Sequence, residues 1–266
     1  MNQTLAWLGL SKIEDLCHKQ IETLLQIYGK PEKIIKATKS DLKKYGLTEK
    51  QSQQIVEITE EQLEQEVIRL KQEKVYFITA DDEKYPQQLR EIYDFPYWIY
   101  ARGNVQILKE KSIAIIGSRN CSRYGETVAK KLAYDIGKQN IHVVSGMAKG
   151  IDAFAHIGCM KSKGKTIAVL GCGVNNIYPK ENEGVYRTIL QQGGVVVSEY
   201  PLNTEPLAQH FPARNRIISG LCEKMIVVEA GERSGSFITV DFALEQGKEV
   251  YSVPGNITSS YSKRNK

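Results

Sequence analysis

The stretch SIAIIGSRNCSRYG, residues 112–125, decides the fold class of this chain. Its first part, 112–117, is an apolar run without polar alternation, which is typical of a strand buried on both faces. A polar turn follows, and residues 125–139 then have the apolar spacing of a helix. The stretch therefore predicts a strand–turn–helix unit of the kind that builds parallel sheets.

The same alternation of strand and helix continues to residue 255. Further strands are expected at 142–146, 166–171, 194–200, 224–230 and 249–255, with helices at 150–163, 182–192 and 236–246. A long loop and a helix with the sequence HFPARNRIISGL (210–221) follow the strand 194–200. Apolar strands separated by helices predict an α/β domain over 111–266, with an extended Rossmann-like, doubly wound, mostly parallel sheet.

Residues 1–70 have the pattern of a small all-α module. Helices are expected at 13–28, 31–38, 40–46 with Ser40 as N-cap, and 48–72 as one long helix. The module resembles a sterile-alpha-motif-like or helix-hairpin-helix unit. A hairpin that grips DNA needs a Gly-x-Gly turn, and this segment offers only Gly46 in its second hairpin. We interpret the module first as an interaction or structural unit.

Residues 71–110 are expected to form a connector that packs on the following domain. A short strand is expected at 75–79, followed by prolines 86 and 96. A cluster of aromatic residues at a domain edge is more typical of packing than of ligand binding. Its members are Tyr93, Phe95, Tyr97, Trp98 and Tyr100.

Composition narrows the class of protein. The 266 residues contain no apolar run long enough to span a membrane, and the first residues lack the pattern of a secretory signal. Five scattered cysteines without a Cys-x-x-Cys pair favour reduced thiols in a cytoplasmic protein over disulfides or zinc. The net charge is +5, and residues 111–266 hold 20 Lys/Arg against 13 Asp/Glu. This excess suits an anionic partner.

Four of the expected strands end in glycine-rich turns. Glycine lets the backbone approach a ligand closely, and the amides at a helix start favour an anion. Because the carboxyl ends of parallel strands meet at one edge, the four turns predict a phosphate-binding edge. The turns are GSRNCSRYG (117–125), SGMAKGIDAFAH (145–156), GCGVNNIYP (171–179) and GERSGSFIT (231–239).

The segment HFPARNRIISGL leaves two interpretations open. The guanidinium groups of Arg214 and Arg216 suit phosphate oxygens, and the Phe211 ring suits base stacking. The alternative is the start of an ordinary helix whose arginines are solvated.

Several chemistries find no support in the residues. The turn at 117 lacks the Gly-x-Gly-x-x-Gly spacing of dinucleotide sites, and no Gly-Lys-Ser/Thr is present. Asp152 and His156 share a helix face, but without a third ligand we expect a capping Asp and a packed His rather than a metal site. Cys172 between two glycines is expected to be small rather than nucleophilic. No nucleophile has an evident activating base, so we expect a binding protein without catalytic residues, metal or cofactor.

Taken in order, the motifs resemble the DNA-processing protein A family (DprA/Smf) over about residues 75–260. The matching segments are YPQQLREIYDFPYWIYARGN, IAIIGSRNCSRYG, VVSGMAKGIDAFAH, AVLGCGVNNIYP, SEYPLNTEPLAQHFPARNRIISGL, VVEAGERSGSFIT and YSVPGNITS. The resemblance implies that the chain binds single-stranded DNA, protects incoming DNA in natural transformation and loads the recombinase RecA. It also implies a homodimer. The family continues beyond PGNITS with a further helix, whereas this sequence ends in SSYSKRNK, so we expect dimer contacts near that end to be incomplete.

The resemblance also implies which residues contact DNA. Stacking and backbone contacts would favour single strands with little sequence preference. The implied contacts are Gly117, Ser118, Arg119, Ser145, Gly146, Lys149, Phe211, Arg214, Asn215, Arg216 and Ser236.

Two rival classes stay open. One is a Rossmann-like enzyme that binds nucleotides or cleaves their N-glycosidic bonds, although AGERSGSFIT lacks the PGGxGT turn that such enzymes carry. The other is a structural adaptor. Release of free base would favour the enzyme, and a gel shift with poly-dT would favour DNA binding.

Overall fold

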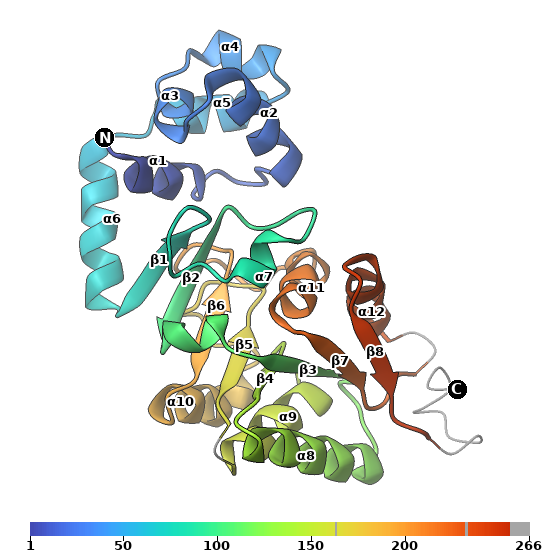
Figure 1. Cartoon of the computed structure of the whole chain (residues 1–266). Coiled ribbons are helices and arrows are strands. Elements are labelled where there is room, and N and C mark those ends of the chain that lie inside the picture. Colours follow the sequence, from blue (N-terminus) through green and yellow to red (C-terminus); the bar gives the residue numbers. More distant parts are fainter. Residues whose placement is uncertain (163, 232–233, 256–266) are drawn as a thin grey trace.

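The computed structural model describes residues 1–162, 164–231 and 234–255, and these contain a single sheet of eight strands (Figure 1). The strand order is β1-β2-β6-β5-β4-β3-β7-β8. In this order, the six strands from β6 through β3 to β8 all pair in parallel, which confirms the doubly wound, mostly parallel fold. The strands are β1 (Val75–Thr79), β2 (Trp98–Gly103), β3 (Ser112–Ile116), β4 (His142–Ser145), β5 (Thr166–Val169), β6 (Val195–Ser198), β7 (Lys224–Val227) and β8 (Glu249–Ser252).

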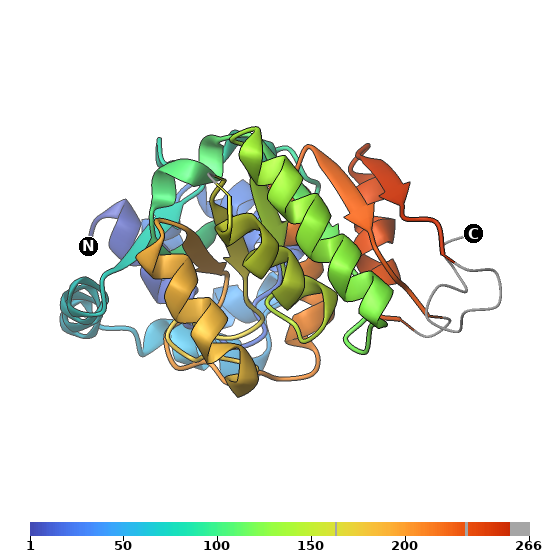
Figure 2. The same ribbon diagram turned by 90° about the horizontal axis from the view of Figure 1, so that it is seen from below.

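Helices cover both faces of the sheet (Figures 1 and 2). Because successive side chains of a strand point to opposite faces, β3 contributes to two separate cores. Ile115 packs among residues of α8 and α9, whereas Ala114 and Ile116 pack among residues of α11 and α12. The first face carries α8 (Arg123–Lys138), α9 (Ile151–Met160) and α10 (Glu183–Gln191), and the second carries α7 (Gln87–Arg90), α11 (His210–Leu221) and α12 (Ser236–Glu245). Short 3-10 turns, η1 (Val105–Lys109) and η2 (Lys180–Asn182), complete the connections.

The segment 71–110 extends this sheet rather than only packing against it. β2 pairs antiparallel with β6, with Tyr100 opposite Ser198, and β1 pairs antiparallel with β2. Residues 98–101 are buried, as expected for a strand inside the sheet. The segment therefore belongs structurally to the α/β domain.

The N-terminal module differs from its sequence-based description at several places. Its first helix, α1, was not expected. The helices expected at 13–28 and 31–38 are shorter, because the first begins at His18 and the second ends at Ile35. The expected long helix 48–72 is divided, because Thr59 accepts a hydrogen bond from the Gln62 amide and the Gln62 side chain accepts one from the Thr59 amide. The N-cap of α4 is Thr38 and not Ser40. The helices are α1 (Gln3–Leu10), α2 (His18–Tyr28), α3 (Pro31–Ile35), α4 (Lys39–Lys44), α5 (Glu49–Val56) and α6 (Glu60–Gln72).

The aromatic cluster joins the module to the sheet. Trp7 of α1 stacks on Tyr97 with ring centroids 5.3 Å apart, and the Ser11 and Tyr100 hydroxyls share a buried 2.7 Å hydrogen bond. Tyr93 is the exception within the cluster, because it is 94% exposed. The packing role expected for the cluster is confirmed for the other members, and the module and sheet share one continuous core. In the described parts of the chain, no helix is both long and apolar enough to cross a bilayer.

Candidate nucleic-acid interface

The glycine-rich turns gather at the carboxyl ends of β3, β4, β5 and β7, which are neighbours in the sheet. The turns after β3 and β4 touch each other, because the Ile151 amide donates to the Ser118 carbonyl at 3.2 Å. Gly150 has φ +76°, and a Cβ there would lie 2.4 Å from the Ser118 oxygen. Only glycine permits this approach, which brings Arg119 and Lys149 to one edge.

A cation and two rings converge at this edge. The Arg119 guanidinium lies 5.8 Å from the centroid of the Phe211 ring, and Arg119 is exposed. Phe211 itself lies against Gly171 and is half-buried. Tyr178, which is 43% exposed, has its ring centroid 5.5 Å from that of Phe211. The arrangement offers a positive charge beside two partly exposed rings, which suits a phosphate next to a stacked base.

A surface hollow of about 740 Å³ opens next to Arg119 at the start of α8. It is bordered by two arginines, Arg119 and Arg123, with Glu126 as its one carboxylate. The remaining border residues are Asn120, Cys121, Ser122, Gly150 and Phe154. The balance of charge in this hollow favours an anionic chain.

Arg214 turns inward. It is 5% exposed, and its Nη1 donates to the Gly146 carbonyl at 2.7 Å and to the Val169 carbonyl. Burial lowers the pKa of Arg214 to about 10, while the nearby Asp152 carboxylate opposes that shift. Arg214 therefore fastens the turn after β4 to the end of β5. In this structure its position is at odds with the expected direct contact to phosphate.

Asp152 holds the same turn from the other side. Its Oδ2 accepts hydrogen bonds from the Gly146 amide at 3.1 Å and the Ala148 amide at 3.4 Å. Burial raises the pKa of Asp152, and the Arg214 charge works against that rise. These two amides are therefore already used by the protein itself and do not face an external anion.

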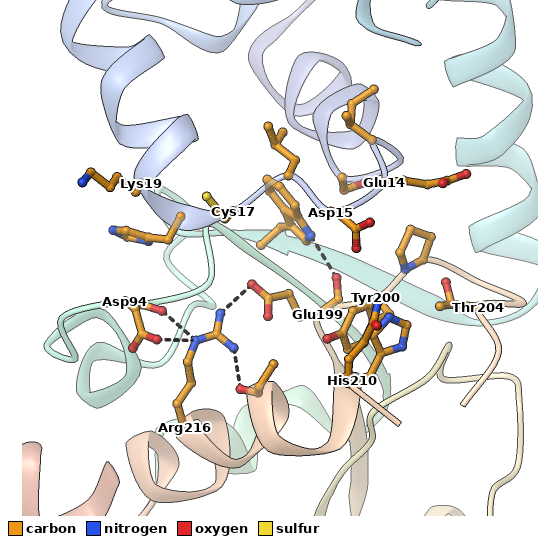
Figure 3. A pocket seen from close by; sticks show the side chains of 18 of the residues that line it. Glu14, Asp15, Cys17, Lys19, Asp94, Glu199, Tyr200, Thr204, His210 and Arg216 are labelled. Carbon is orange, nitrogen blue, oxygen red and sulfur yellow. Dashed lines mark hydrogen bonds and ion pairs between the residues drawn. The ribbon is translucent and has the colours of Figure 1, made fainter. Parts of the chain in front are cut away.

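Arg216 is also buried and forms ion pairs (Figure 3). Its Nη2 donates to Glu199 Oε1 at 2.7 Å, and its Nε lies 3.1 Å from Asp94 Oδ2. Its Nη1 donates to the Ala213 carbonyl at 3.0 Å. Its Nε also donates to the Asp94 carbonyl at 2.8 Å. With two acids and two carbonyls as partners, a contact of Arg216 with phosphate disagrees with this structure.

The pocket beside Arg216, about 820 Å³ in volume, lies between the helical module and α11 (Figure 3). Its walls carry more carboxylates than cations, and two of those carboxylates are the partners of Arg216. The acidic side chains of the lining are Glu14, Asp15, Glu22, Asp94 and Glu199, against Lys12, Lys19 and Arg216. A polyanion would be repelled there, so this pocket does not suit nucleic acid, unlike the edge that carries Arg119.

The remaining candidate residues divide into exposed and structural ones. Lys149 is exposed and pairs with Glu181 at 2.5 Å, and Asn215 is half-buried. The buried Ser145 hydroxyl donates to the Ile115 carbonyl at 2.7 Å, and Ser236 donates to the Gly117 carbonyl at 2.9 Å. The backbone of 117–118 is half-buried. The structure thus brings most of the candidates to one edge, with Arg216 in the acidic pocket instead, and leaves only some of them facing outward.

The histidine and cysteine that resembled site residues have structural surroundings. His156 is fully buried, and its Nδ1 lies 2.6 Å from the Thr166 hydroxyl. Burial raises the pKa of Cys172 to about 11, so its thiol stays protonated at neutral pH. Among the residues that the structure describes, no group of three side chains could hold a metal ion. The packed His156 is confirmed.

Comparison with known proteins decides the family. The model of the family described as DNA recombination-mediator protein A matches residues 76–266. The chain belongs to this DprA/Smf family. It is 38% identical over 257 residues to Protein Smf of Escherichia coli, covering 97% of this chain and 68% of that one. It is 44% identical over 181 residues to DNA processing protein DprA of Streptococcus pneumoniae, covering 68% and 64% of the two chains.

Solved DprA structures have the same fold. The X-ray structure of DprA from Streptococcus pneumoniae superposes with a TM-score of 0.83 at 35% identity, covering 98% of this chain and 90% of that one. A DprA from Helicobacter pylori, described for its single-stranded DNA binding mode, gives 0.63 at 29% identity, covering 69% and 83%. The first match extends over the helical module as well. The chain spans slightly less than two thirds of the two DprA sequences that match it at 44% and 42% identity.

Sequence reasoning missed two residues at the edge of this DprA-family domain. Tyr178 lies in the third glycine turn, yet nothing in the local sequence distinguished its exposed ring from a packed one. Glu229 follows β7 and is buried at the base of the first turn. The sequence signal for Glu229 was a carboxylate at the end of an apolar run, because a buried segment rarely contains a charged side chain without a partner.

Proposed function

We propose that this DprA-family chain binds single-stranded DNA along the carboxyl edge of its sheet. The observation that carries the proposal is the exposed Arg119 over the Phe211 ring, with Tyr178 beside it. Arg119 and Lys149 would contact phosphates, and the two rings would stack on bases at roughly 1–3 kcal/mol per base. The single-stranded DNA binding of the Helicobacter pylori relative supports the proposal.

The geometry favours single strands over duplex. Stacking on Phe211 and Tyr178 needs an exposed base face, which a duplex hides. Rings and charges do not distinguish base edges, so sequence preference would be slight. Arg214, Arg216 and Ser145 enter the proposal as supports of the edge rather than as contacts, because their polar groups are used within the protein.

The decisive experiment removes Arg119. Arg119→Ala should weaken binding to oligo-dT roughly tenfold, the size of one lost charge-assisted hydrogen bond. The slope of log affinity against log salt should fall by about 0.7, the value for one phosphate contact on a single strand. Both quantities come from fluorescence anisotropy titrations over a salt range.

Lys224→Gln is the matched control. Lys224 is an exposed cation at the start of β7, at the opposite end of the strands, and it pairs with Glu249. Its removal should leave the salt slope unchanged. If the titration curves of Arg119→Ala and of the unmutated protein coincide, Arg119 is not a phosphate contact.

An enzyme that cleaves nucleotide N-glycosidic bonds is the second candidate. Its supporting observation is the glycine-rich edge alone, because none of the described turns pairs a nucleophile with an activating base. Release of free base from nucleoside monophosphates, measured by chromatography, would favour it over DNA binding.

The wider role rests on the family. We propose that the protein protects incoming DNA in natural transformation, loads RecA onto it and works in the cytoplasm as a homodimer. The family's description as a recombination mediator supports the RecA partnership. The terminal strand β8 and the exposed Leu244 and Tyr251 support pairing with a second copy. Mass measurement in solution and RecA filament assembly on protein-coated single strands test these two partners.

A further inference from the structure

Glu229 is a buried carboxylate that supports the proposed DNA path without facing it. The residue is 1% exposed and lies two positions beyond the end of β7. Its Oε2 accepts a hydrogen bond from the Ser122 amide at 2.8 Å, and its Oε1 accepts one from the Ser122 hydroxyl at 2.5 Å. A buried carboxylate is costly unless it is hydrogen bonded, so these two bonds are central to its placement.

Glu229 ties both ends of the loop that carries Arg119. At the first residue of the loop, the Ser118 amide donates to the Glu229 carbonyl at 2.7 Å. At its last residue, Ser122 donates twice to the Glu229 carboxylate. The loop 118–122 is therefore fixed at each end to one residue of a neighbouring strand, and Arg119 lies between the two fixed points.

The two glycines that flank this loop make room for Glu229. A Cβ on Gly125 would lie 2.4 Å from Glu229 Oε2. A Cβ on Gly117 would lie 2.7 Å from Ile151 Cγ1 and 2.8 Å from the Glu229 carbonyl oxygen. These distances are too short for non-bonded contacts. Gly125 therefore leaves the space that the Glu229 carboxylate fills, and Gly117 leaves space for Ile151 and the Glu229 backbone.

The carboxylate also occupies the place of an anion at the start of α8. Ser122 is the N-cap of α8, and its Oγ accepts from the Gly125 amide at 3.1 Å while donating to Glu229. A helix N-terminus attracts negative charge, and here Glu229 supplies it. The Ser122 and Gly125 amides are thus used within the protein, and the Glu229 carboxylate would repel a phosphate at the start of α8.

We propose that Glu229 is the positioning residue that places Arg119 in the DNA groove, an inference that rests on the proposed single-stranded DNA binding. Glu229 acts through the loop and never touches DNA. It has the same sign of charge as DNA, so its effect on binding is opposite to what its charge alone would produce.

That opposition of sign gives a sharp test. Removing a negative charge near the site should by itself strengthen binding to a polyanion. Glu229→Ala should instead weaken oligo-dT binding roughly tenfold, because Arg119 loses its place. Glu229→Gln, which keeps one oxygen acceptor for Ser122, should fall between Glu229→Ala and the unmutated protein. Glu110→Gln, which removes an exposed carboxylate just before β3, is the control and should bind at least as tightly as the unmutated protein.

Gly125→Ala provides the same perturbation while Glu229 is present. Alanine favours a helix more than glycine does, so helix propensity alone would stabilise this variant. Its Cβ would nonetheless displace the Glu229 carboxylate, and DNA binding should weaken as in Glu229→Ala. If Glu229→Ala loses cooperative urea unfolding, Gly125→Ala decides the question alone.

A double-mutant cycle separates positioning from general damage. In an Arg119→Ala background, the Glu229→Ala change should cost little further affinity, because the residue that it positions is gone. Full additivity of the two losses, or Glu229→Ala and Gly125→Ala binding as tightly as the unmutated protein, would overturn the inference. A failure of the proposed function is distinguishable, since the unmutated protein would then show no salt-dependent binding to oligo-dT.

Discussion

Residues of one type have opposite roles at this sheet edge. Arg119 is exposed and lies over the Phe211 ring. Arg216 lies in a motif that also predicted phosphate binding, yet it is 7% exposed and pairs with two acids. The difference lies in what tertiary contacts surround each guanidinium, because the intrinsic chemistry of the side chains is the same. His156 shows the same principle for a titratable group.

His156 is held in its neutral form. The Thr166 hydroxyl donates to the Val143 carbonyl, so it accepts from His156, whose proton is therefore on Nδ1. The other ring nitrogen, Nε2, is buried and has no hydrogen-bond partner. Burial, helped by the nearby Arg214 charge, lowers the pKa of His156 to about 3.

The shift makes the fold sensitive to acid. Below about pH 6.5 the histidine is protonated in the unfolded chain but not in the folded one, so the unfolded state binds more protons. As the pH is lowered below this value, the free energy of unfolding should therefore fall. The contribution of His156 to the slope approaches about 1.4 kcal/mol per pH unit. Urea unfolding of the unmutated protein and of His156→Gln from about pH 7 to about pH 5 checks this.

The variant should show a flatter dependence on pH, even if it is less stable at neutral pH. Equal slopes for His156→Gln and the unmutated protein would show that His156 is protonated in the folded state.

Among the elements, α11 separates two environments. Phe211 on its first turn faces the edge with Arg119, and Arg216 faces the acidic pocket (Figure 3). The Arg216 ion pairs connect α11 to the end of β6 through Glu199 and to the loop before β2 through Asp94. These contacts make Arg216 an anchor of the helix that carries the stacking ring.

Arg216→Met should therefore destabilise the fold. Glu199 and Asp94 would lose their cation in a partly buried site, at a cost of about 2–4 kcal/mol in the free energy of unfolding. Arg187→Met is the control, because Arg187 forms an exposed pair with Glu183, and it should cost less than about 0.5 kcal/mol.

DNA titration of the same two variants distinguishes anchor from contact. Folded Arg216→Met should keep the salt slope of the unmutated protein. An unchanged unfolding free energy together with a smaller salt slope would instead return Arg216 to the phosphate contacts.

The whole molecule is held together by a core that the helical module shares with the sheet. Trp7 of α1 lies 5.3 Å from Tyr97 and 6.0 Å from Trp98, measured between ring centroids. His18 adds a 2.9 Å contact between its Nδ1 and the Phe95 carbonyl. The apolar core of the module is therefore continuous with that of the sheet.

The module and the sheet should consequently unfold as one unit. The two tryptophans are the only ones in the sequence, and both lie in the shared core, Trp7 on the module and Trp98 on the sheet. In urea, the fluorescence of Trp7→Phe and of Trp98→Phe should each change at the same midpoint as that variant's far-UV circular dichroism. A fluorescence transition separated from the circular dichroism transition would indicate two independent domains.

The sequence predicted the fold correctly where a local pattern is compatible with only one kind of structure. The apolar run before Gly117 had to be a buried strand, and its repetition predicted the parallel sheet and the edge at which the turns meet. The long helix expected over 48–72 failed because a capping box at Thr59 outweighed the continuous apolar spacing. The helix α1 was missed because its apolar residues 6–10 are buried on all sides and lack a helical stripe.

By itself, the sequence determined the parallel strands, the glycine turns and which residue types reach the edge, because hydrophobic periodicity and turn chemistry are local. Only the tertiary structure decided which of those residues face outward. Arg119 and Phe211 remain accessible, while Arg214 and Arg216 turn inward to carbonyls and carboxylates that are distant in sequence. Burial and pairing depend on neighbours from other elements, and no local pattern specifies them.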